Sequence, residues 1–369
     1  MKRYALIDLK KETLDHSGAL VKAFERVISR VQFFKGSDLN SFEKKFADFV
    51  GTEYAIGVSS GTAALSLSLK AIGVGQGDEV ITSPFTYFAT AEAIINVGAK
   101  PVFVDVNKNN LGMEIKNVEK AITSKTKAVV PIHVYGLPMY INKLVSLAKT
   151  YEIKVVEDCS HADGTKVGNK MLGSFGVAGC FSLYPSKILG AFGDAGVVVT
   201  DSKQIQKKIV MLRDHGRKEG NKDLHHLVGG TMCMDNLQAA ILNYKLRYLK
   251  NKIKKRQVIA NVYNGEFEGT KIKTLKIDSG VSPSWYVYTI LIKRRHELMN
   301  YLSTRGIESK VYYPTPLHLQ PALKYLGYKK GDFPVAEKIS RSVLSLPLHQ
   351  YLKKNDVQYI SGQVKSFFS

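Results

Sequence analysis

The sequence predicts an α/β fold with a mostly parallel central sheet, and three observations support this prediction. From Asp78 onward, short apolar runs alternate with segments of helical length and pattern. The runs are rich in Val and Ile without polar alternation, as is typical of parallel strands buried on both faces. The chain has 369 residues, of which 44% are hydrophobic. It can therefore bury a large core, and its length suggests two domains or one large domain with an appendage.

The N-terminal part predicts helices followed by a strand and a possible anion site. Residues 18–50 have two apolar stripes at helical spacing, interrupted by the glycine-bearing segment FFKGSD. A short strand over 54–58 then runs through Ser60, Gly61 and Thr62 into a helix. The start of a helix offers free N–H groups and a positive end to a phosphate, and the two hydroxyls could add hydrogen bonds. The same hydroxyls could instead only cap the helix.

The alternating region continues the expected α/β winding. Strands are predicted in EVITS (79–83), KPVFVDV (100–106) and KAVVPIHVYG (127–136), and helices in YFATAEAIINVG (87–98), 115–122 and 141–150. Phe85, Tyr87 and Phe88 cluster where a strand turns into a helix. An aromatic ring there could stack on a flat cofactor, or the cluster could only pack in the core.

The stretch 155–200 carries the residues that suggest chemistry. Asp158 follows an apolar run, Ser182 lies in the next one, and Lys187 occupies a turn before the glycine-rich segment GAFGDAG. This set suits pyridoxal phosphate (PLP), because a lysine amine can hold the cofactor's aldehyde as a Schiff base. A carboxylate can keep the pyridine nitrogen protonated, so that the ring accepts electrons. Taken singly, each residue has an ordinary structural explanation, such as a cap, a turn or a solvated surface position.

The C-terminal third predicts a smaller domain. A polar loop with the sequence RDHGRKEGNKDLHHLVGG (213–230) precedes a long helix that starts in MDNLQAAIL (234–242). Such long loops are often functional. The helix suits a connector, so we predict a large domain over 1–248 and a small α+β domain over 249–369.

Composition excludes several classes of function. The formal net charge is +21, but basic residues are scattered apart from KNKIKKR (250–256), so we expect no nucleic-acid partner. The positive field would attract small anions such as nucleotide diphosphates. Cys159, Cys180 and Cys233 lack metal-ligand spacing, so we expect buried thiols and no metal. No apolar run is long enough to cross a bilayer, which predicts a cytoplasmic protein without a membrane partner.

An ordered set of motifs resembles the DegT/StrS family of PLP-dependent sugar aminotransferases over nearly the whole chain. The motifs are SSGTAAL, PFTYFATAEAI, GAKPVFVDV, EDCSHADG, FSLYPSK, GDAGVVVTD, LRDHGR, MDNLQAAIL, YYPTPLHLQP and LSLPLH. The resemblance implies the aspartate-aminotransferase-like (type I) fold and a homodimer with active sites at the subunit interface. It also implies amino transfer from an amino acid, glutamate by family resemblance, to a keto sugar carried on a nucleotide.

The resemblance also implies roles for single residues. Lys187 matches the Schiff-base lysine, Asp158 the partner of the pyridine nitrogen, and Ser182 a phosphate ligand. Gly61 and Thr62, with Ser60 beside them, match the residues that bind the cofactor's phosphate. Tyr87 matches the aromatic residue that stacks on the cofactor ring. Tyr313 and His318 match residues that contact the substrate.

The sequence departs from the family pattern at three positions. His161 stands where the family usually has the glutamine near the cofactor's phenolic oxygen, and an imidazole can donate a hydrogen bond but can also titrate. Thr231 and Cys233 stand where the family often has an asparagine and an arginine before the long helix. A threonine hydroxyl could still reach the phosphate of the neighbouring subunit.

The substrate prediction depends on residues 312–337, which are most similar to the branch of the family that acts on 3-keto sugars. We therefore predict a 3-keto sugar on UDP or dTDP, in cell-surface glycan or sugar antibiotic biosynthesis. Three alternatives stay open: a 4-keto sugar, dehydration of the sugar, and a non-catalytic regulator on the same fold. Dehydration is associated with replacement of the Schiff-base lysine, so Lys187 argues against it.

Overall fold

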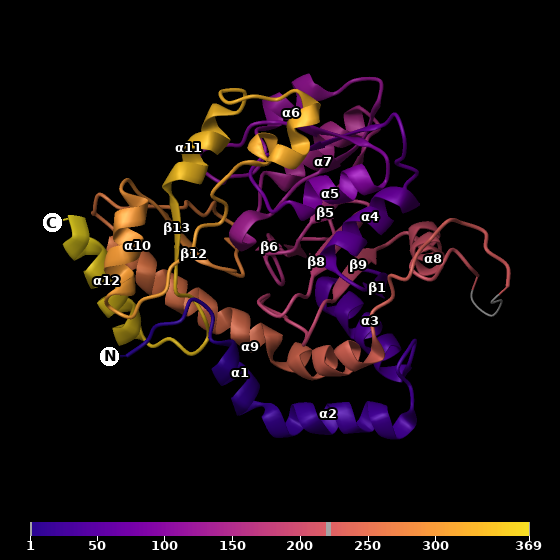
Figure 1. Ribbon diagram of the computed structural model, residues 1–369, viewed down its shortest axis with the longest axis horizontal. Coiled ribbons are helices and arrows are strands. Elements are labelled where there is room, and N and C mark those ends of the chain that lie inside the picture. Colours follow the sequence, from indigo (N-terminus) through magenta and orange to yellow (C-terminus); the bar gives the residue numbers. More distant parts are fainter. Residues whose placement is uncertain (1, 219–222, 369) are drawn as a thin grey trace.

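A computed structural model describes residues 2–218 and 223–368 and has a seven-stranded sheet at its centre (Figure 1). The strand order is β1-β9-β8-β5-β4-β2-β3. The strands are β1 (Tyr54–Val58), β2 (Glu79–Thr82), β3 (Lys100–Phe103), β4 (Thr126–Val130), β5 (Lys154–Asp158), β8 (Ala178–Ser182) and β9 (Gly196–Thr200). Strand β9 runs antiparallel to both of its neighbours, and the remaining pairings are parallel. The predicted α/β fold with a mostly parallel sheet is confirmed.

Helices bury both faces of this sheet. They are α4 (Gly61–Ala71), α5 (Ala89–Asn96), α6 (Ile115–Ala121), α7 (Ile141–Thr150) and α8 (Lys203–Leu212). Neighbouring strand residues serve opposite faces: Val156 packs with Leu65 of α4, whereas Val155 belongs to the cluster that contains Leu144 of α7. Double-sided burial explains why the strands read as continuous apolar runs.

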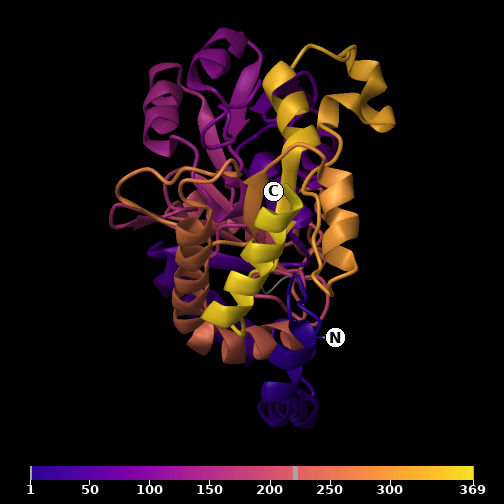
Figure 2. The ribbon, with the colours of Figure 1, turned by 90° about the vertical axis from the view of Figure 1, so that its left-hand side faces the viewer.

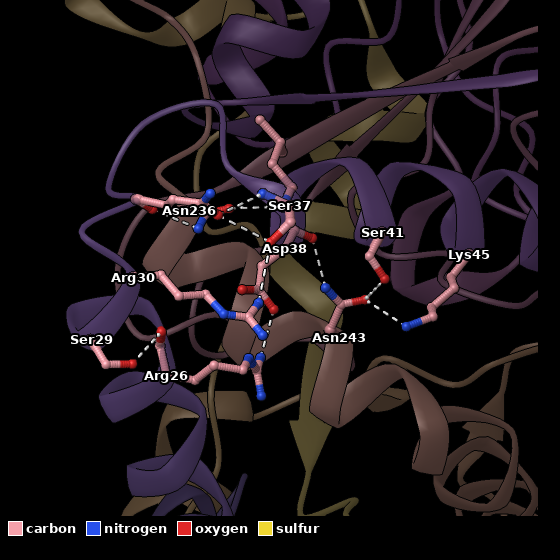
Figure 3. Close-up of polar contacts among 11 residues, drawn as sticks. Arg26, Ser29, Arg30, Ser37, Asp38, Ser41, Lys45, Asn236 and Asn243 are labelled. Carbon is pink, nitrogen blue, oxygen red and sulfur yellow. Dashed lines mark hydrogen bonds and ion pairs between the residues drawn. The ribbon is translucent and has the colours of Figure 1, made fainter.

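The N-terminal helices lie against one long helix, α9 (Asn236–Phe267) (Figure 1). They are α1 (Leu9–Asp15), α2 (Ser17–Arg30) and α3 (Ser37–Val50). Two asparagines of α9, seven residues apart, bind the turn between α2 and α3 (Figure 3). Asn236 Oδ1 accepts from Leu39 N at 2.9 Å, and Asn243 Nδ2 donates to Asp38 O at 2.7 Å. These bonds fix the predicted break at FFKGSD against α9.

A second, smaller layer lies beside the sheet (Figure 2). It contains β10 (Lys273–Thr274), β12 (Tyr288–Leu291), β13 (Val343–Leu346), α10 (Arg295–Ser303), α11 (Pro334–Ser342) and α12 (Lys354–Phe368). The expected boundary at 248/249 falls inside the continuous helix α9, which packs against both α3 and α12. The residues at the N-terminus also lie here, since the Tyr4 ring stacks on the Tyr359 ring at 5.3 Å. The division into two domains stays a prediction.

A small sheet joins the two layers next to the end of β5. Strands β6 (Lys166–Val167) and β7 (Lys170–Met171) form a hairpin, and β11 (Val281–Ser282) pairs with β6. This pairing brings the segment that follows β11, with Tyr286, against the layer of the seven-stranded sheet. Within the described part of the chain, no helix combines the length and the apolar character needed to cross a membrane.

Candidate active site

Asp158 is the last residue of β5, and its carboxylate is buried and held on both oxygens. Oδ2 accepts from the Thr90 hydroxyl of α5 at 2.8 Å, and Oδ1 accepts from Ser160 N at 3.1 Å. The two donors fix the orientation of the carboxylate. The sequence located Asp158, whereas nothing in it pointed to Thr90.

Ser182 ends β8 and lies directly against the start of α4. A Cβ atom at Gly61 would lie 2.7 Å from Ser182 Cβ, so a larger residue would push the strand end and the helix apart. The Ser60 hydroxyl accepts from Ala63 N at 3.0 Å and caps the helix. Of the two roles considered for Ser60, helix cap and phosphate ligand, the hydrogen bond to Ala63 N supports the cap. The N–H groups of Gly61 and Thr62 begin the first turn, have no acceptor within the helix, and can bind an anion.

Lys187 lies in the turn that follows β8. Its backbone N–H donates to Tyr184 O at 2.8 Å, and Ala191 N donates to Leu183 O at 2.8 Å, which closes the turn. The Lys187 Nζ atom lies 4.9 Å from the centroid of the Tyr286 ring. The amine is therefore held at an aromatic surface next to the ends of β5 and β8.

His161 lies between aromatic side chains and is neutral around pH 7. Its ring stacks on Tyr286 with centroids 4.1 Å apart and an angle of 13° between the planes. Tyr135 N donates to Nδ1 at 3.4 Å, which places the ring proton on Nε2, 3.3 Å from the Tyr313 hydroxyl. Burial lowers the pKa of His161 well below its usual range, and the charge of Lys187 lowers it further. The ring can therefore donate a hydrogen bond as the family's amide would.

Tyr87 and Tyr313 extend this aromatic wall toward solvent. The centroids of the two rings are 6.1 Å apart, and Tyr87 is 64% exposed. In the same predicted cluster, Phe85 is fully buried and packs against Tyr313 at 6.3 Å. Of the two roles considered for the cluster, Phe85 thus has the core role, and Tyr87 is free to face a ligand.

His318 lies outside this group, so its expected role in substrate contact stays a prediction. Its side chain is 0% exposed, and Nε2 lies 3.1 Å from Glu337 Oε1. The ring also packs edge-on against Phe333 at 4.7 Å. The imidazole is fully enclosed and packs at the proline-framed turn.

Thr231 lies in the loop before α9 and is exposed. Its hydroxyl is 3.1 Å from His215 Nε2, and Met232 O accepts from Ser59 N at 2.8 Å. The structure thus joins this loop to the start of the anion site but leaves the Thr231 side chain at the surface. Residues 219–222 of the predicted loop lie outside the described residues.

The three buried groups His133, Glu157 and Cys159 have ligand atoms within 4.8 Å of one another. Glu157 already accepts hydrogen bonds from the N–H groups of Gly173, Phe175 and Gly176, at 2.7 to 3.0 Å, and lies 3.1 Å from His133 Nε2. These bonds occupy the carboxylate and fix the turn before β8. The cluster is therefore a structural support for the strand that carries Ser182.

Sequence reasoning missed Tyr286, which organises the site. Its ring contacts both His161 and Lys187, its N–H donates to Tyr135 O at 2.9 Å, and its carbonyl accepts from Arg256 at 2.6 Å. The aromatic run WYVY (285–288) was the available signal, but it also fits a core strand. The pairing of β11 with β6 is what brings Tyr286 to the site, and local sequence does not reveal this pairing.

The residues present fit PLP. The site offers four groups beside the aromatic wall: the buried carboxylate of Asp158, the amine of Lys187, the neutral imidazole of His161 and the start of α4. The absence of a side chain at Gly61 allows the strand that carries Ser182 to approach this helix start closely. These groups match the ring nitrogen, the aldehyde, the phenolic oxygen and the phosphate of that cofactor.

Comparisons with known proteins identify the family of the chain. Residues 15–365 match the model of the DegT/DnrJ/EryC1/StrS aminotransferase family. The chain is 36% identical to the pleiotropic regulatory protein of Geobacillus stearothermophilus over 366 residues, which cover 98% of each chain. It is 34% identical to the UDP-N-acetyl-3-dehydro-alpha-D-glucosamine 3-aminotransferase of Acidithiobacillus ferrooxidans, over 98% of this chain and 96% of the relative.

A solved structure is similar over the whole chain. The crystal structure of DesV from Streptomyces venezuelae superimposes with a TM-score of 0.96 at 34% identity, over 100% of this chain and 99% of that one. The expected type I aminotransferase fold is thereby confirmed.

Proposed function

The chain belongs to the DegT/DnrJ/EryC1/StrS aminotransferase family, and we propose that it aminates the 3-keto group of a sugar carried on UDP or dTDP. The family uses PLP, and the chain is a PLP-dependent aminotransferase. The observation that supports the assignment of the site is that Lys187 and neutral His161 both lie against the Tyr286 ring. Tyr313, which contacts His161, is also within reach of the Asp158 charge.

The chain's own residues have distinct tasks in this reaction. PLP, when bound, supplies an electron sink for the electrons released from the Cα–H bond. Asp158 would keep the ring nitrogen protonated, and its bonds from Thr90 and Ser160 fix the orientation of the carboxylate. Lys187 would hold the cofactor through its amine and, once released, move a proton at the substrate carbon.

The remaining residues bind and orient. Ser182 and the N–H groups of Gly61 and Thr62 would hold the phosphate at the start of α4. His161 would donate from Nε2 to the phenolic oxygen, and Tyr87 would cover the ring. Tyr313, whose hydroxyl lies 3.3 Å from His161 Nε2, would border the side from which the sugar enters.

Three observations support the substrate. The relative from A. ferrooxidans is named for a UDP-linked 3-dehydro sugar. The segment 312–337 is similar to the 3-keto branch of the family, and it supplies Tyr313 to the aromatic wall. The net charge of +21 favours an anionic diphosphate. Glutamate is the proposed donor of the amino group.

We propose a homodimer in which Thr231 faces the neighbouring subunit's site. Its exposure and the exposure of Tyr87 leave both side chains available to a partner. Sedimentation analysis at decreasing protein concentration, combined with turnover measurements, tests this. A monomer with full activity at nanomolar concentration would contradict the proposal.

Two measurements test the function itself. Borohydride reduction of the loaded protein and peptide mapping should place the cofactor on Lys187, and a Lys245→Arg control should be labelled at the same position. Matched 3-keto and 4-keto nucleotide sugars, incubated with glutamate, should then be compared for amine product by mass spectrometry. Preference for the 4-keto sugar would refute the carbon that we propose but not amino transfer.

A regulatory role is the second candidate, because one relative is named a pleiotropic regulatory protein. The same panel separates the two. Cofactor bound at Lys187 without turnover of any nucleotide sugar would favour regulation.

A further inference from the structure

Asp163 is a buried acid beneath the segment that carries Lys187. Its side chain is 0% exposed, and Oδ2 accepts from Leu189 N at 3.3 Å. Leu189 lies two residues after Lys187, so this bond connects the carboxyl to the turn of the lysine. The other oxygen, Oδ1, is buried and has no hydrogen-bond partner among the described residues.

The surroundings of Asp163 are cationic. Lys187 acts on it from the turn, and Lys252 and Arg256 act from α9. The cationic side chains on α9 have partners of their own: Lys252 pairs with Glu12 at 2.7 Å, and Arg256 donates to Trp285 O at 2.9 Å. The Cys159 thiol also interacts with the Asp163 charge, and burial raises the pKa of that thiol well above its usual range.

Asp163 is therefore an acid that changes charge in a functionally relevant range. Burial raises its pKa to about 7, although the Leu189 N–H and the charges of Lys187, Lys252 and Arg256 each lower it. Asp158, five residues earlier, has two donors on its oxygens, whereas Asp163 has one long hydrogen bond. Neither Asp163 nor its bond to Leu189 has a part in the function proposed above.

We propose that Asp163 is a positioning residue for Lys187: it fixes the turn through Leu189, and its ionised carboxylate stabilises the positive charge on the lysine nitrogen. The proposal rests on the assignment of Lys187 as the residue that holds the cofactor. Lys187 must be cationic at one stage and accept a proton at Nζ at another. A nearby carboxylate that is itself near its midpoint makes this change responsive to pH.

The direction of the effect follows from charge interaction. A negative carboxylate favours the protonated form of a nearby nitrogen and raises its pKa. Asp163→Asn removes the charge but keeps an amide oxygen that can accept from Leu189 N. The midpoint of the pH-dependent absorbance of the Lys187-bound cofactor should therefore shift to lower pH.

The first experiment is that absorbance titration on the loaded proteins, with melting temperatures measured in parallel. Asp105→Asn is the matched control, because Asp105 is a buried acid that accepts from Val335 N and Ala336 N at 2.9 Å, at the start of α11. The control should keep the wild-type midpoint. If Asp163→Asn folds and its absorbance midpoint equals that of the wild type, the proposal is overturned. The role of Asp163 would then be limited to its contact with Leu189 in the turn.

A reciprocal measurement covers the case in which Asp163→Asn does not fold. Coupling between two sites is mutual, so Lys187→Ala must raise the midpoint of Asp163 as much as Asp163 shifts the lysine. Carboxyl infrared bands of the cofactor-free proteins report this titration. Lys100→Ala is the control, since Lys100 lies on β3 and pairs with Glu79 at 3.9 Å, away from the turn of Lys187. Equal Asp163 midpoints in the wild type and in Lys187→Ala would refute the coupling.

Failure of this inference can be told apart from failure of the proposed function. If borohydride labelling falls on another lysine, the function of Lys187 is wrong and this proposal falls with it. If labelling falls on Lys187 but the absorbance midpoint does not shift in Asp163→Asn, the function stands and Asp163 is structural only.

Discussion

The two walls of the active site are built in different ways. On the side of the large sheet, Asp158 and Ser182 are the last residues of neighbouring strands, and Lys187 follows in a closed turn. On the side of the smaller layer, Tyr286 and Tyr313 come from irregular segments, and ring contacts hold both side chains. Two hydrogen bonds to Tyr135 O and from Arg256 also hold the backbone of Tyr286. The first wall is fixed by neighbouring strands of one sheet, and the second by packing and isolated hydrogen bonds.

The difference teaches where charge and where shape are controlled. A parallel sheet delivers polar side chains to one edge with little freedom, which suits groups whose charge must be placed accurately. Aromatic rings in irregular segments can adjust to a ligand, which suits the side that meets a sugar. We therefore expect substitutions in the strand-end wall to act on turnover, and substitutions in the aromatic wall to act on stability and binding.

Asp158→Asn should have the largest effect, because it removes the charge from the strand-end wall and leaves its shape unchanged. The asparagine side chain has the same size as that of Asp158 and can occupy the same space beside Thr90 and the N–H of Ser160. A neutral amide no longer stabilises a protonated ring nitrogen, so turnover should fall by about a thousandfold, or about 4 kcal/mol in barrier.

The measurement is kcat for the 3-keto substrate together with the melting temperature. Asp105→Asn, at a buried acid that accepts from Val335 N and Ala336 N, serves as the comparison for general effects of changing a buried acid. Near-normal turnover in Asp158→Asn would remove the distinction between the two walls.

His318→Ala should act on stability and leave the reaction nearly unchanged. The side chain is enclosed, pairs with Glu337 and packs on Phe333. Truncation leaves a cavity and removes one hydrogen-bond partner of a carboxylate, which we expect to lower the free energy of unfolding by about 2 to 3 kcal/mol. Denaturant unfolding and KM should be measured on the same preparation. A large rise in KM at unchanged stability would return His318 to the binding site.

Sequence patterns predicted the strand-end wall well for a physical reason. A residue at the end of an apolar run in an α/β chain is carried to the common edge of the sheet, so Asp158 and Ser182 could be placed before the tertiary structure was known. Predicted strand 54–58 and the helices on both sides of FFKGSD also match β1, α2 and α3. In these regions local pattern and tertiary packing agree.

The aromatic wall could not be predicted in the same way. Tyr286 reaches the site through the pairing of β11 with β6, two short strands more than 100 residues apart in the sequence. Histidines do not reveal their exposure in a sequence, so the burial of His318 could not be read from its motif. Long-range pairing and burial decide such cases, and neither is visible in local spacing.

Tyr286 offers a sharper comparison, because its ring belongs to the packing wall but contacts the lysine of the other wall. Tyr286→Phe keeps the ring that stacks on His161 and lies 4.9 Å from Lys187 Nζ, so it should change turnover by less than about threefold. Tyr286→Leu removes both ring contacts and should cost about 1 to 1.5 kcal/mol, or about tenfold in turnover. Steady-state kinetics of the pair separates ring from hydroxyl. Equal losses in both variants would show that the hydroxyl carries the effect.

His161→Gln should have a small effect, and its pH profile is more informative than its rate. Tyr135 N donates to Nδ1, and the low pKa of the buried ring keeps the Nε2 proton in place around pH 7. A glutamine amide donates a hydrogen bond in the same way, so turnover should change by less than about tenfold. Because the imidazole is already neutral, the profile of kcat/KM between pH 6 and 9 should keep its shape. If the wild-type profile has an inflection in that range and His161→Gln loses it, the imidazole titrates during turnover. The aromatic wall would then carry charge, as the strand-end wall does.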